Sequence, residues 1–510
     1  MTSVFPKKVK MTIDEARYWE GLGRQEMDFY QVLSELLDNS ISASGFDSDG
    51  DLSPFNIEIT IQRIGNKIRV KVADQGAGMT INDLEEHVLS PGGKGSTTGP
   101  LNEHGFGLKN ALCMLSLGNR FSFKIQTRDE KAIKQNQYYL VEGPFSSNMY
   151  IKLEDASNWN TNLIHTTEHK GTRIYAETSY DYFNTLYRRG KYFEDPLIIR
   201  LIEHLGVTYR GFLANQSNKM WLRWQDLGDD EEHPNTSAEW KEHRIIHIPI
   251  PYDVNGCTEK KIEIPRPEGT ATVIYREGSL DKGKTKDATQ GLPYPLMIYY
   301  QGNIPAQGID ISVRGRVIKT RQLPEIWPVR QRHNDYNYFV GELLLDDKFR
   351  TVNNKIAVDP HSPFWQMLLD KLNTEELYSP TKRTQVQTEK DIKEKMKKVL
   401  EAAVSGCTVS LDSPVWSGSG VKIDIYHQKI TGVEIYEVKP DTAEPIHVYQ
   451  LLMYWDGIVV DQKKSPDLAR LVAKDAPGSV TNMIDKLNER KDALGNDYKF
   501  EFKKVSEFGI

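Results

Sequence analysis

Hydrophobic residues follow a helical period at the start of the chain and a strand period soon after it. Within residues 13–43 the apolar positions recur every three to four residues, which predicts one long helix or two. Isoleucines then alternate with polar residues across 57–61, residues 65–66 suit a turn, and apolar residues alternate again across 68–72. This pattern predicts a β-hairpin whose second strand runs directly into Asp74.

The middle of the chain mixes strand-like and helical patterns. A helix is expected to start near Gly107, and further strands are expected up to about residue 177. Strand-like segments then occur at 245–250 and 296–300, and a helix is expected at 363–372. These segments predict a second α/β domain after the first.

A polar segment without apolar periodicity separates the last part of the chain. This segment, residues 379–390, contains Pro380 and indicates a linker. The remaining residues have the pattern helix, strand, strand, helix, which predicts a third domain. We therefore expect an α/β protein with a first domain at 1–188, a second at 189–376, a linker at 377–390 and a third at 391–510.

Composition agrees with several folded domains and gives no general affinity for nucleic acid. The 510 residues exceed the size at which one hydrophobic core keeps growing, and 38% hydrophobic with 27% charged residues is typical of globular proteins. The net charge of −6 means that any contact with DNA must come from local basic patches.

Cysteine usage and hydropathy indicate a reducing compartment. The three cysteines, Cys113, Cys257 and Cys407, are odd in number and far apart, which fits no structural zinc site. The N-terminal residues lack the apolar stretch of a signal peptide, and no uncharged apolar run reaches 18 residues. We therefore expect a cytoplasmic protein without membrane insertion.

Three polar side chains share one face of the first predicted helical stretch. Glu35, Asp38 and Asn39 are three and four positions apart, while the neighbouring leucines fall largely on the other face. A carboxylate can orient or deprotonate a water, and an amide oxygen can ligate a hard cation. The alternative is a capped, solvated helix face, and this motif alone does not separate the two.

Two glycine-containing segments follow, and each is a weak signal alone. Asp74 precedes Gly76 and Gly78, so it can accept a hydrogen bond from an exocyclic amine while the backbone passes close to a ring; a plain β-turn is the simpler interpretation. Glycine-rich residues 92–96 and 105–109 lead into a helix, whose N-terminus presents free N–H groups to phosphate.

The pair Gly171-Thr172 starts a later strand and completes a series of four elements. In order and spacing, the acid and amide on the helix, the Asp-x-Gly-x-Gly box, the glycine-rich segment and this pair resemble the GHKL superfamily of gyrase, MutL, histidine kinases and MORC proteins. The resemblance implies a Bergerat α/β sandwich with a mixed sheet, which binds ATP with Mg²⁺.

By this resemblance the helix carries the chemistry of hydrolysis. Glu35 is similar to the general base for attack of water on the γ-phosphate, and Asn39 is similar to the Mg²⁺ ligand. Asp38 matches the acidic residue that precedes the Asn in gyrase-like members, for which a structural and a catalytic role both stay open.

The resemblance assigns the adenine and the phosphates to the other elements. Asp74, with Gly76 and Gly78 beside it, is similar to the reader of adenine, and Thr172 is similar to the residue that supports it through a hydrogen bond. Residues 92–107 resemble the ATP lid.

Within this lid, Gly105 and Gly107 are expected at the phosphates. The run from 104 to 110 is most similar to MORC-type and MutL-type ATPases. Histidine kinases are disfavoured because no phosphoacceptor-helix domain is recognised before the ATPase, whereas a long domain follows it.

The second domain is expected to resemble an S5-type transducer. In MORC, gyrase and MutL relatives this domain supplies a lysine to the γ-phosphate, and Lys355, which lies shortly before Asp359-Pro360 and a helix, resembles that position in MORC proteins. The alternative is an ordinary surface lysine, and the match of this domain is otherwise loose.

A predicted hairpin near the C-terminus gathers acids and a lysine. Strands are expected at 421–426 and 433–439, with a turn between them. Glu437 and Lys439 then point to the same side, and the hairpin can set Asp424 beside them. Such a group can hold Mg²⁺ and position water for phosphodiester attack, although a cross-strand salt bridge on a solvated face is the starting assumption.

The helix expected after this hairpin carries Gln450 and Tyr454 four positions apart on one face. The whole set resembles the PD-(D/E)xK nucleases of the RecB-like branch, which implies a restriction-endonuclease-like α/β fold. By resemblance Asp424 and Glu437 bind metal, Lys439 orients or activates water, and Gln450 with Tyr454 shapes the site.

This second resemblance has departures. No Pro precedes Asp424, and the histidine of many RecB-like members is not found. An upstream helical acid such as Glu401 is a candidate for the metal shell, but surface exposure is favoured. The basic stretch at 393–398 is likewise more simply interpreted as a solvated helix face than as a phosphate contact.

Together the resemblances imply an ATP-gated, metal-dependent nuclease. Nucleotide would close a homodimer through the first domains around DNA, in prokaryotic defence or DNA processing, with a partner protein also conceivable. Two alternatives stay open: a MORC-like DNA-compacting ATPase with an inactive nuclease module, and a GHKL-type chaperone.

Overall fold

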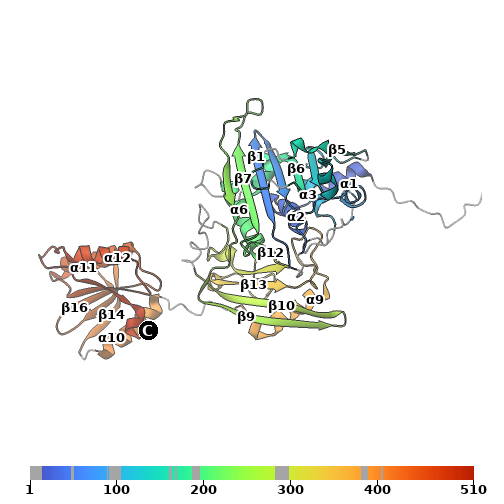
Figure 1. The fold of residues 1–510 in the computed structure, drawn as a ribbon. Helices are drawn as coiled ribbons and strands as arrows, with labels where there is room; N and C mark the ends of the chain where they lie inside the picture. The colour runs from blue at the N-terminus through green and yellow to red at the C-terminus, as the bar shows by residue number, and fades with distance from the viewer. Residues whose placement is uncertain are drawn as a thin grey trace, which may run out of the picture. The chain divides into compact units, whose positions relative to one another are not determined.

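The computed structural model describes most of the chain, which divides into two compact units, residues 1–383 and 384–510 (Figure 1). The described residues are 14–46, 51–88, 90, 93, 101, 105–146, 148–159, 163–166, 169–186, 196–281, 298–380, 389–403 and 406–509. Within these ranges, no helix has both the length and the apolar character needed to cross a membrane.

A mixed eight-stranded sheet forms the first layer of the N-terminal unit. Its order is β5-β4-β3-β6-β2-β1-β7-β8, and among the described strands of this sheet only β1 and β7 pair in parallel. The expected hairpin is confirmed by β1 and β2. The strands are β1 (Asn56–Ile64), β2 (Lys67–Asp74), β3 (Phe123–Arg128), β4 (Gln137–Glu142), β5 (Ile151–Asp155), β6 (Gly171–Ser179), β7 (Lys219–Asp226) and β8 (Lys241–Arg244).

Helices cover the apolar face of this sheet. The helical pattern of the first residues is resolved into two helices, and the helix expected at Gly107 is present. Leu33, Leu37, Ile59, Val70 and Leu112 are among the buried residues of the shared core, so the alternating face of the strands and the periodic faces of the helices meet. The helices of this layer are α1 (Glu15–Leu22), α2 (Phe29–Ser42), α3 (Gly107–Leu115), α4 (Glu130–Lys134), α5 (Tyr180–Phe183), α6 (Pro196–Thr208) and α7 (Arg210–Leu213).

The sheet continues past residue 188, where the sequence suggested a domain boundary. Because β7 pairs with β1 along eight positions, residues 219–226 belong to the first sheet. The segment 245–250 is not a strand, contrary to the expectation. Ile245, Ile248 and Ile250 are buried, but Pro249 and Pro251 lack the N–H that a sheet ladder needs. The described part of 296–300 forms a bend instead of a strand.

A second, five-stranded sheet completes the N-terminal unit, in the order β12-β11-β13-β10-β9. The helix expected at 363–372 is confirmed by α9 (Pro363–Thr374), which packs on this sheet (Figure 1). The strands are β9 (Tyr252–Arg266), β10 (Gly269–Leu280), β11 (Gly308–Val313), β12 (Arg316–Gln322) and β13 (Phe339–Leu345).

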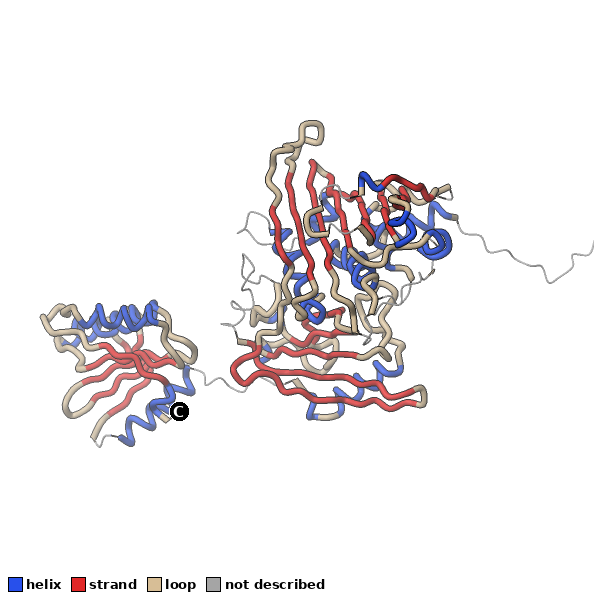
Figure 2. Tube along the Cα trace, in the orientation of Figure 1, coloured by secondary structure: helices blue, strands red, loops and turns tan. Residues whose placement is uncertain are grey.

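The C-terminal unit is a five-stranded mixed sheet with helices on both faces (Figure 2). The order is β14-β15-β16-β17-β18; the first three strands are antiparallel and the last three are parallel. The strands are β14 (Thr408–Pro414), β15 (Lys422–Gln428), β16 (Val433–Val438), β17 (Leu468–Ala473) and β18 (Phe500–Lys504), and the helices are α10 (Glu389–Ala403), α11 (Pro445–Gln462) and α12 (Gly478–Asn488).

Candidate nucleotide and hydrolysis sites

The polar residues of α2 are buried and do not form a solvated helix face. Glu35 is 1% exposed and Asp38 is fully buried, whereas Asn39 is half-buried. The Asn39 Nδ2 donates to the Glu35 carbonyl oxygen at 2.8 Å, which leaves the amide oxygen as the atom available to a hard cation. The interpretation of this motif as a solvated face is therefore excluded.

Asp74 ends β2 directly beside α2. Its carboxylate accepts hydrogen bonds from the Ser40 hydroxyl at 3.1 Å, from the Gly76 N–H at 2.9 Å and from the Thr172 N–H at 3.1 Å. Burial raises the pKa of Asp74 to about 6, although these donors oppose the rise. Since Ser40 follows Asn39, the helix and the strand bring the predicted amide and the predicted adenine reader to one place.

Thr172 supports Asp74 through its backbone N–H, while its hydroxyl contacts Thr127. Its Oγ1 lies 3.1 Å from Thr127 Oγ1, and Thr127 also accepts a hydrogen bond from the Met79 N–H at 2.7 Å. Gly78 has φ +75°, and a Cβ there would lie 2.3 Å from the Arg128 carbonyl oxygen. The turn after Asp74 is therefore fixed against β3.

The N-terminus of α3 approaches the predicted general base closely. A Cβ at Gly107 would lie 2.4 Å from Glu35 Oε2, so any larger residue here would force the Glu35 carboxylate to move. Gly105 lies just before the helix, and its carbonyl oxygen accepts a hydrogen bond from Lys109 Nζ at 2.6 Å. Within the predicted lid, residues 92, 94–100 and 102–104 lie outside the described residues.

Lys109 had no role in the sequence-based assignment. Its ammonium also donates to the Gly93 carbonyl oxygen at 3.1 Å, so it joins the two described ends of the glycine-rich segment. Burial lowers its pKa to about 8. The Gly-Leu-Lys run at 107–109 was the only signal that marked this residue.

Two cations reach the acids of α2, one from β12 and one from the loop at 351–358. Lys355 Nζ lies 2.9 Å from Asp38 Oδ2 and 3.4 Å from Glu35 Oε2. Arg316, at the start of β12, forms an ion pair with Asp38, and its Nη1 lies 3.6 Å from Glu35 Oε1. The Tyr209 hydroxyl donates to Asp38 Oδ1 at 2.9 Å. Lys355 is only 8% exposed, which excludes an ordinary surface lysine.

This cluster sets the protonation of its members. Burial raises the pKa of Glu35, and the charges of Lys355 and Arg316 oppose the rise. Burial would lower the pKa of Lys355, but the charges of Asp38 and Glu35 raise it. Glu35 is thus a stronger base than an exposed glutamate, beside cations that stay charged. Sequence reasoning missed Arg316, since its partner Asp38 lies 278 residues away.

Comparison with known proteins identifies the first part of this unit. Residues 24–177 match the family described as "Histidine kinase-, DNA gyrase B-, and HSP90-like ATPase". These residues form a GHKL-type ATPase domain. A solved structure described as "Crystal Structure of N terminal domain of a DNA repair protein" is similar over 72% of this chain and 98% of its own, with 13% identity and a TM-score of 0.39. No curated protein matches the chain by sequence.

The residues of the GHKL-type domain fit a nucleotide better than a free metal ion. Among the described residues, no group of three or more His, Cys, Asp and Glu side chains is placed to hold a metal. A Mg²⁺ ion that arrives on phosphate oxygens needs few protein ligands, and the Asn39 amide oxygen suits one such position. The buried Asp74 carboxylate accepts hydrogen bonds from three protein donors, and its remaining acceptor capacity suits the amine edge of a base.

The C-terminal unit has a separate group of buried acids on β15 and β16, and the half-buried Lys439 follows β16 directly. Lys439 Nζ lies 2.7 Å from Glu437 Oε1 and 4.0 Å from Asp424 Oδ2, and the Val438 N–H donates to Asp424 Oδ2 at 2.8 Å. Asp424 is 7% exposed and Glu437 is fully buried. A salt bridge on a solvated face is therefore excluded.

Helix α11 brings the buried Tyr454 near Glu437, and the Tyr454 hydroxyl opposes the rise in the pKa of that carboxyl. Gln450 lies one turn earlier on the same helix and is half-buried. Burial and the charge of Asp424 raise the pKa of Glu437 to about 7. The charge of Lys439 opposes this rise.

Helix α10 supplies two members that the sequence did not indicate. Lys393 Nζ lies 3.2 Å from Asp424 Oδ1, so the interpretation of this lysine as part of a solvated face is wrong. Glu389 Oε2 lies 3.0 Å from Lys439 Nζ. Glu401, the acid considered as an additional ligand, is exposed and lies 3.9 Å from Lys397. The helical period alone could not show which turn of α10 faces the sheet.

Proposed function

We propose that the protein hydrolyses ATP in its N-terminal unit and uses the nucleotide state to control metal-dependent cleavage of nucleic acid by its C-terminal unit. The observation that carries the first half is the convergence of Glu35, Asn39, Asp74 and Lys355 on α2 and its neighbours. The family of residues 24–177 supports the same nucleotide chemistry.

In the proposed reaction, Glu35 removes a proton from a water molecule, and the water oxygen bonds to the γ-phosphorus. The bond from that phosphorus to the β–γ bridging oxygen breaks, and ADP leaves. Asn39 ligates the Mg²⁺ that accompanies the phosphates, and Asp74 accepts a hydrogen bond from the adenine amine. The raised pKa of Glu35 suits a general base, because a carboxylate of ordinary pKa holds a proton weakly.

Lys355 gives the second sheet a way to sense the nucleotide. Its ammonium lies between Asp38 and Glu35, and a γ-phosphate beside Glu35 would compete with these acids for it. We propose that this exchange shifts the loop at 351–358 and favours a homodimer of the ATPase domains. The expected dimer rests on resemblance to GHKL relatives.

The ATPase proposal is tested by turnover and binding measured on the same variants. Glu35→Gln should bind ATP within a few-fold of the wild type but lose turnover by at least about a hundredfold. Lys355→Met should lower kcat by about a hundredfold, since one cation at the transferring phosphate is lost. Glu20→Gln, at an exposed position of α1, is the matched control. Turnover at the wild-type rate in Glu35→Gln would exclude Glu35 as the base.

For the C-terminal unit, Asp424 and Glu437 are the proposed metal ligands, and Lys439 orients the attacking water, with Gln450 and Tyr454 shaping the site. The proposed nuclease activity rests on the burial and proximity of the two acids.

Plasmid and RNA are incubated with Mg²⁺, with and without ATP, and Asp424→Asn should abolish any cleavage seen. The exposed acid Glu401 provides the control variant Glu401→Gln. If wild-type protein binds DNA but never cuts it, the DNA-compacting ATPase is favoured instead.

A further inference from the structure

The face of the eight-stranded sheet that points away from the helices has its own chemistry. Along β2, Val70, Val72 and Asp74 point to the helices, so Arg69 and Lys71 point to the opposite side. The strands β1, β6, β3 and β7 place polar, cationic and aromatic side chains on that same side. Any site here is separated from the proposed nucleotide site by the thickness of the sheet.

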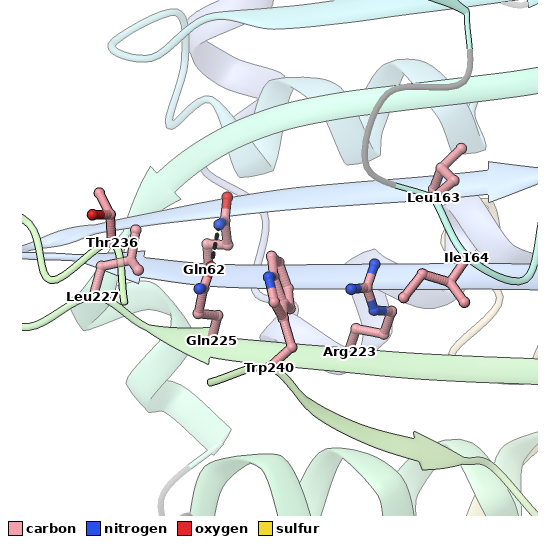
Figure 3. Close-up of a pocket in the computed structure, with 8 residues that line it drawn as sticks. All are labelled: Gln62, Leu163, Ile164, Arg223, Gln225, Leu227, Thr236 and Trp240. Atoms are coloured by element: carbon pink, nitrogen blue, oxygen red, sulfur yellow. Dashed lines mark hydrogen bonds between the residues drawn. The ribbon is translucent and has the colours of Figure 1, made fainter. Parts of the chain in front are cut away.

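Two adjoining hollows mark this face. They share Gln62 and Trp240, and their volumes are about 510 and 460 Å³, each large enough for a mononucleotide. In the second hollow, Trp240 lies between Gln225 and Arg223, as Figure 3 shows. The Arg223 guanidinium carbon is 4.5 Å from the centroid of the Trp240 ring.

Lys71 is the decisive residue of the larger hollow. It lines the hollow and is only 8% exposed, yet its ammonium makes no hydrogen bond or ion pair with a described residue. The other cations of this hollow are neutralised: Arg69 pairs with Glu177 at 2.9 Å, and Lys124 pairs with Glu142 at 2.9 Å.

Glu58 is the carboxylate whose charge acts on Lys71, but its oxygens contact other residues. It lies 3.2 Å from Arg223 Nη1 and accepts the His165 N–H at 2.8 Å. Burial lowers the pKa of Lys71 to about 8, so the ammonium stays largely charged at neutral pH. A buried cation without an ion pair at contact distance among the described residues is unfavourable, and an anionic ligand would relieve it.

Aromatic and amide groups surround this ammonium. Lys71 Nζ lies 5.5 Å from the centroid of the Tyr175 ring, and Tyr175 lines the same hollow with Gln62, Gln126 and Trp240. A ring face suits stacking with a planar base, side-chain amides suit its hydrogen-bonding edges, and the ammonium suits a phosphate.

We propose that this sheet face binds phosphate-bearing nucleobases, either as a free mononucleotide or as successive units of a single strand. The phosphate lies against Lys71, and the base stacks on Tyr175. The adjoining hollow beyond Gln62 and Trp240 continues the site, which favours a strand. The proposal does not depend on ATP hydrolysis or on the nuclease.

The test uses full-length protein in EDTA, so that neither Mg²⁺-ATP chemistry nor cleavage can occur. Binding of a labelled oligothymidylate of about twelve nucleotides is followed by fluorescence anisotropy, with unlabelled dTMP as competitor. Thymine has no exocyclic amine for Asp74, so the probe avoids the proposed adenine site. Lys71→Met is compared with Lys131→Met, which removes the same charge from exposed α4.

Lys71→Met should weaken oligothymidylate binding at least about tenfold and reduce the salt slope by about 0.7, the loss of one phosphate contact. Tyr175→Leu should weaken it about tenfold, and Lys131→Met should leave it within twofold. Unchanged thermal midpoints show that the variants are folded. Competition by dTMP that Lys71→Met abolishes would identify the free nucleotide as a ligand. Equal affinities for Lys71→Met and Lys131→Met, or no binding of either probe by the wild type, would overturn the proposal.

Discussion

The buried ion cluster between α2 and the second sheet leads to a quantitative prediction. Asp38→Asn keeps the size of the side chain and the oxygen that accepts from Tyr209, but it removes one of the two negative charges opposite Arg316 and Lys355. The two cations are then buried with Glu35 as their only acid in the cluster. Removal of one partner from a buried pair costs about 3–5 kcal/mol.

We therefore expect Asp38→Asn to lower the free energy of unfolding of the N-terminal unit by about 3–5 kcal/mol. Urea unfolding, followed by tryptophan fluorescence and circular dichroism, measures this loss. Lys355→Met alone should also destabilise, whereas the double variant restores the charge balance and should recover at least about 1 kcal/mol of the summed losses.

Glu20→Gln provides the control for this cycle. Its partner Arg24 is exposed, so the change should stay within about 0.5 kcal/mol. If Asp38→Asn unfolds within about 1 kcal/mol of that control, or if the two single losses simply add, the cluster does not stabilise the contact between the two sheets and the reasoning fails.

Three further predictions concern single sites. Because the pKa of Asp74 is about 6, its carboxylate is protonated below that pH, and ADP affinity measured by calorimetry should fall as pH drops from 7 to 5, with no such fall in Asp74→Asn. Gly107→Ala would set a Cβ 2.4 Å from Glu35 Oε2, so steady-state ATP turnover should fall at least about tenfold, while Gly21→Ala, which meets nothing within 4 Å, should not change it. Asp492 accepts hydrogen bonds from Trp455 and Ser465, so Asp492→Ala should destabilise the C-terminal unit by about 2–3 kcal/mol in thermal unfolding, and a flat midpoint would contradict this.

Local periodicity was sufficient for the elements that carry the first motifs. The hairpin before Asp74 and the helix at Gly107 follow from alternation and from glycine position, because these signals act over a few residues. The strand expected at 245–250 failed for a related reason. Its isoleucines have the apolar pattern of a strand, but Pro249 and Pro251 lack the N–H that strand pairing needs.

Contacts between distant segments were beyond such reasoning. Arg316 contacts Asp38, which lies 278 residues away in the sequence. The residues around either of them do not indicate this contact. In the C-terminal unit, Lys393 and Glu389 join the acids of the hairpin only because α10 turns that side toward the sheet. When charged residues occur on several faces of a helix, the sequence alone does not show which face packs against the sheet.

The parallel pairing of β1 with β7 has a consequence for any attempt to isolate the ATPase domain. A polypeptide that stops near residue 188 would lack β7 and β8 and would leave the backbone of β1 unpaired along a long, straight edge. Such edges recruit strands from other molecules, so the truncated fragment should self-associate even though it holds all four sequence elements that resemble the GHKL superfamily. The sequence motifs before residue 188 and the strand β7 that covers β1 therefore lie in different segments of the chain. An ATPase fragment needs both segments to stay free of self-association.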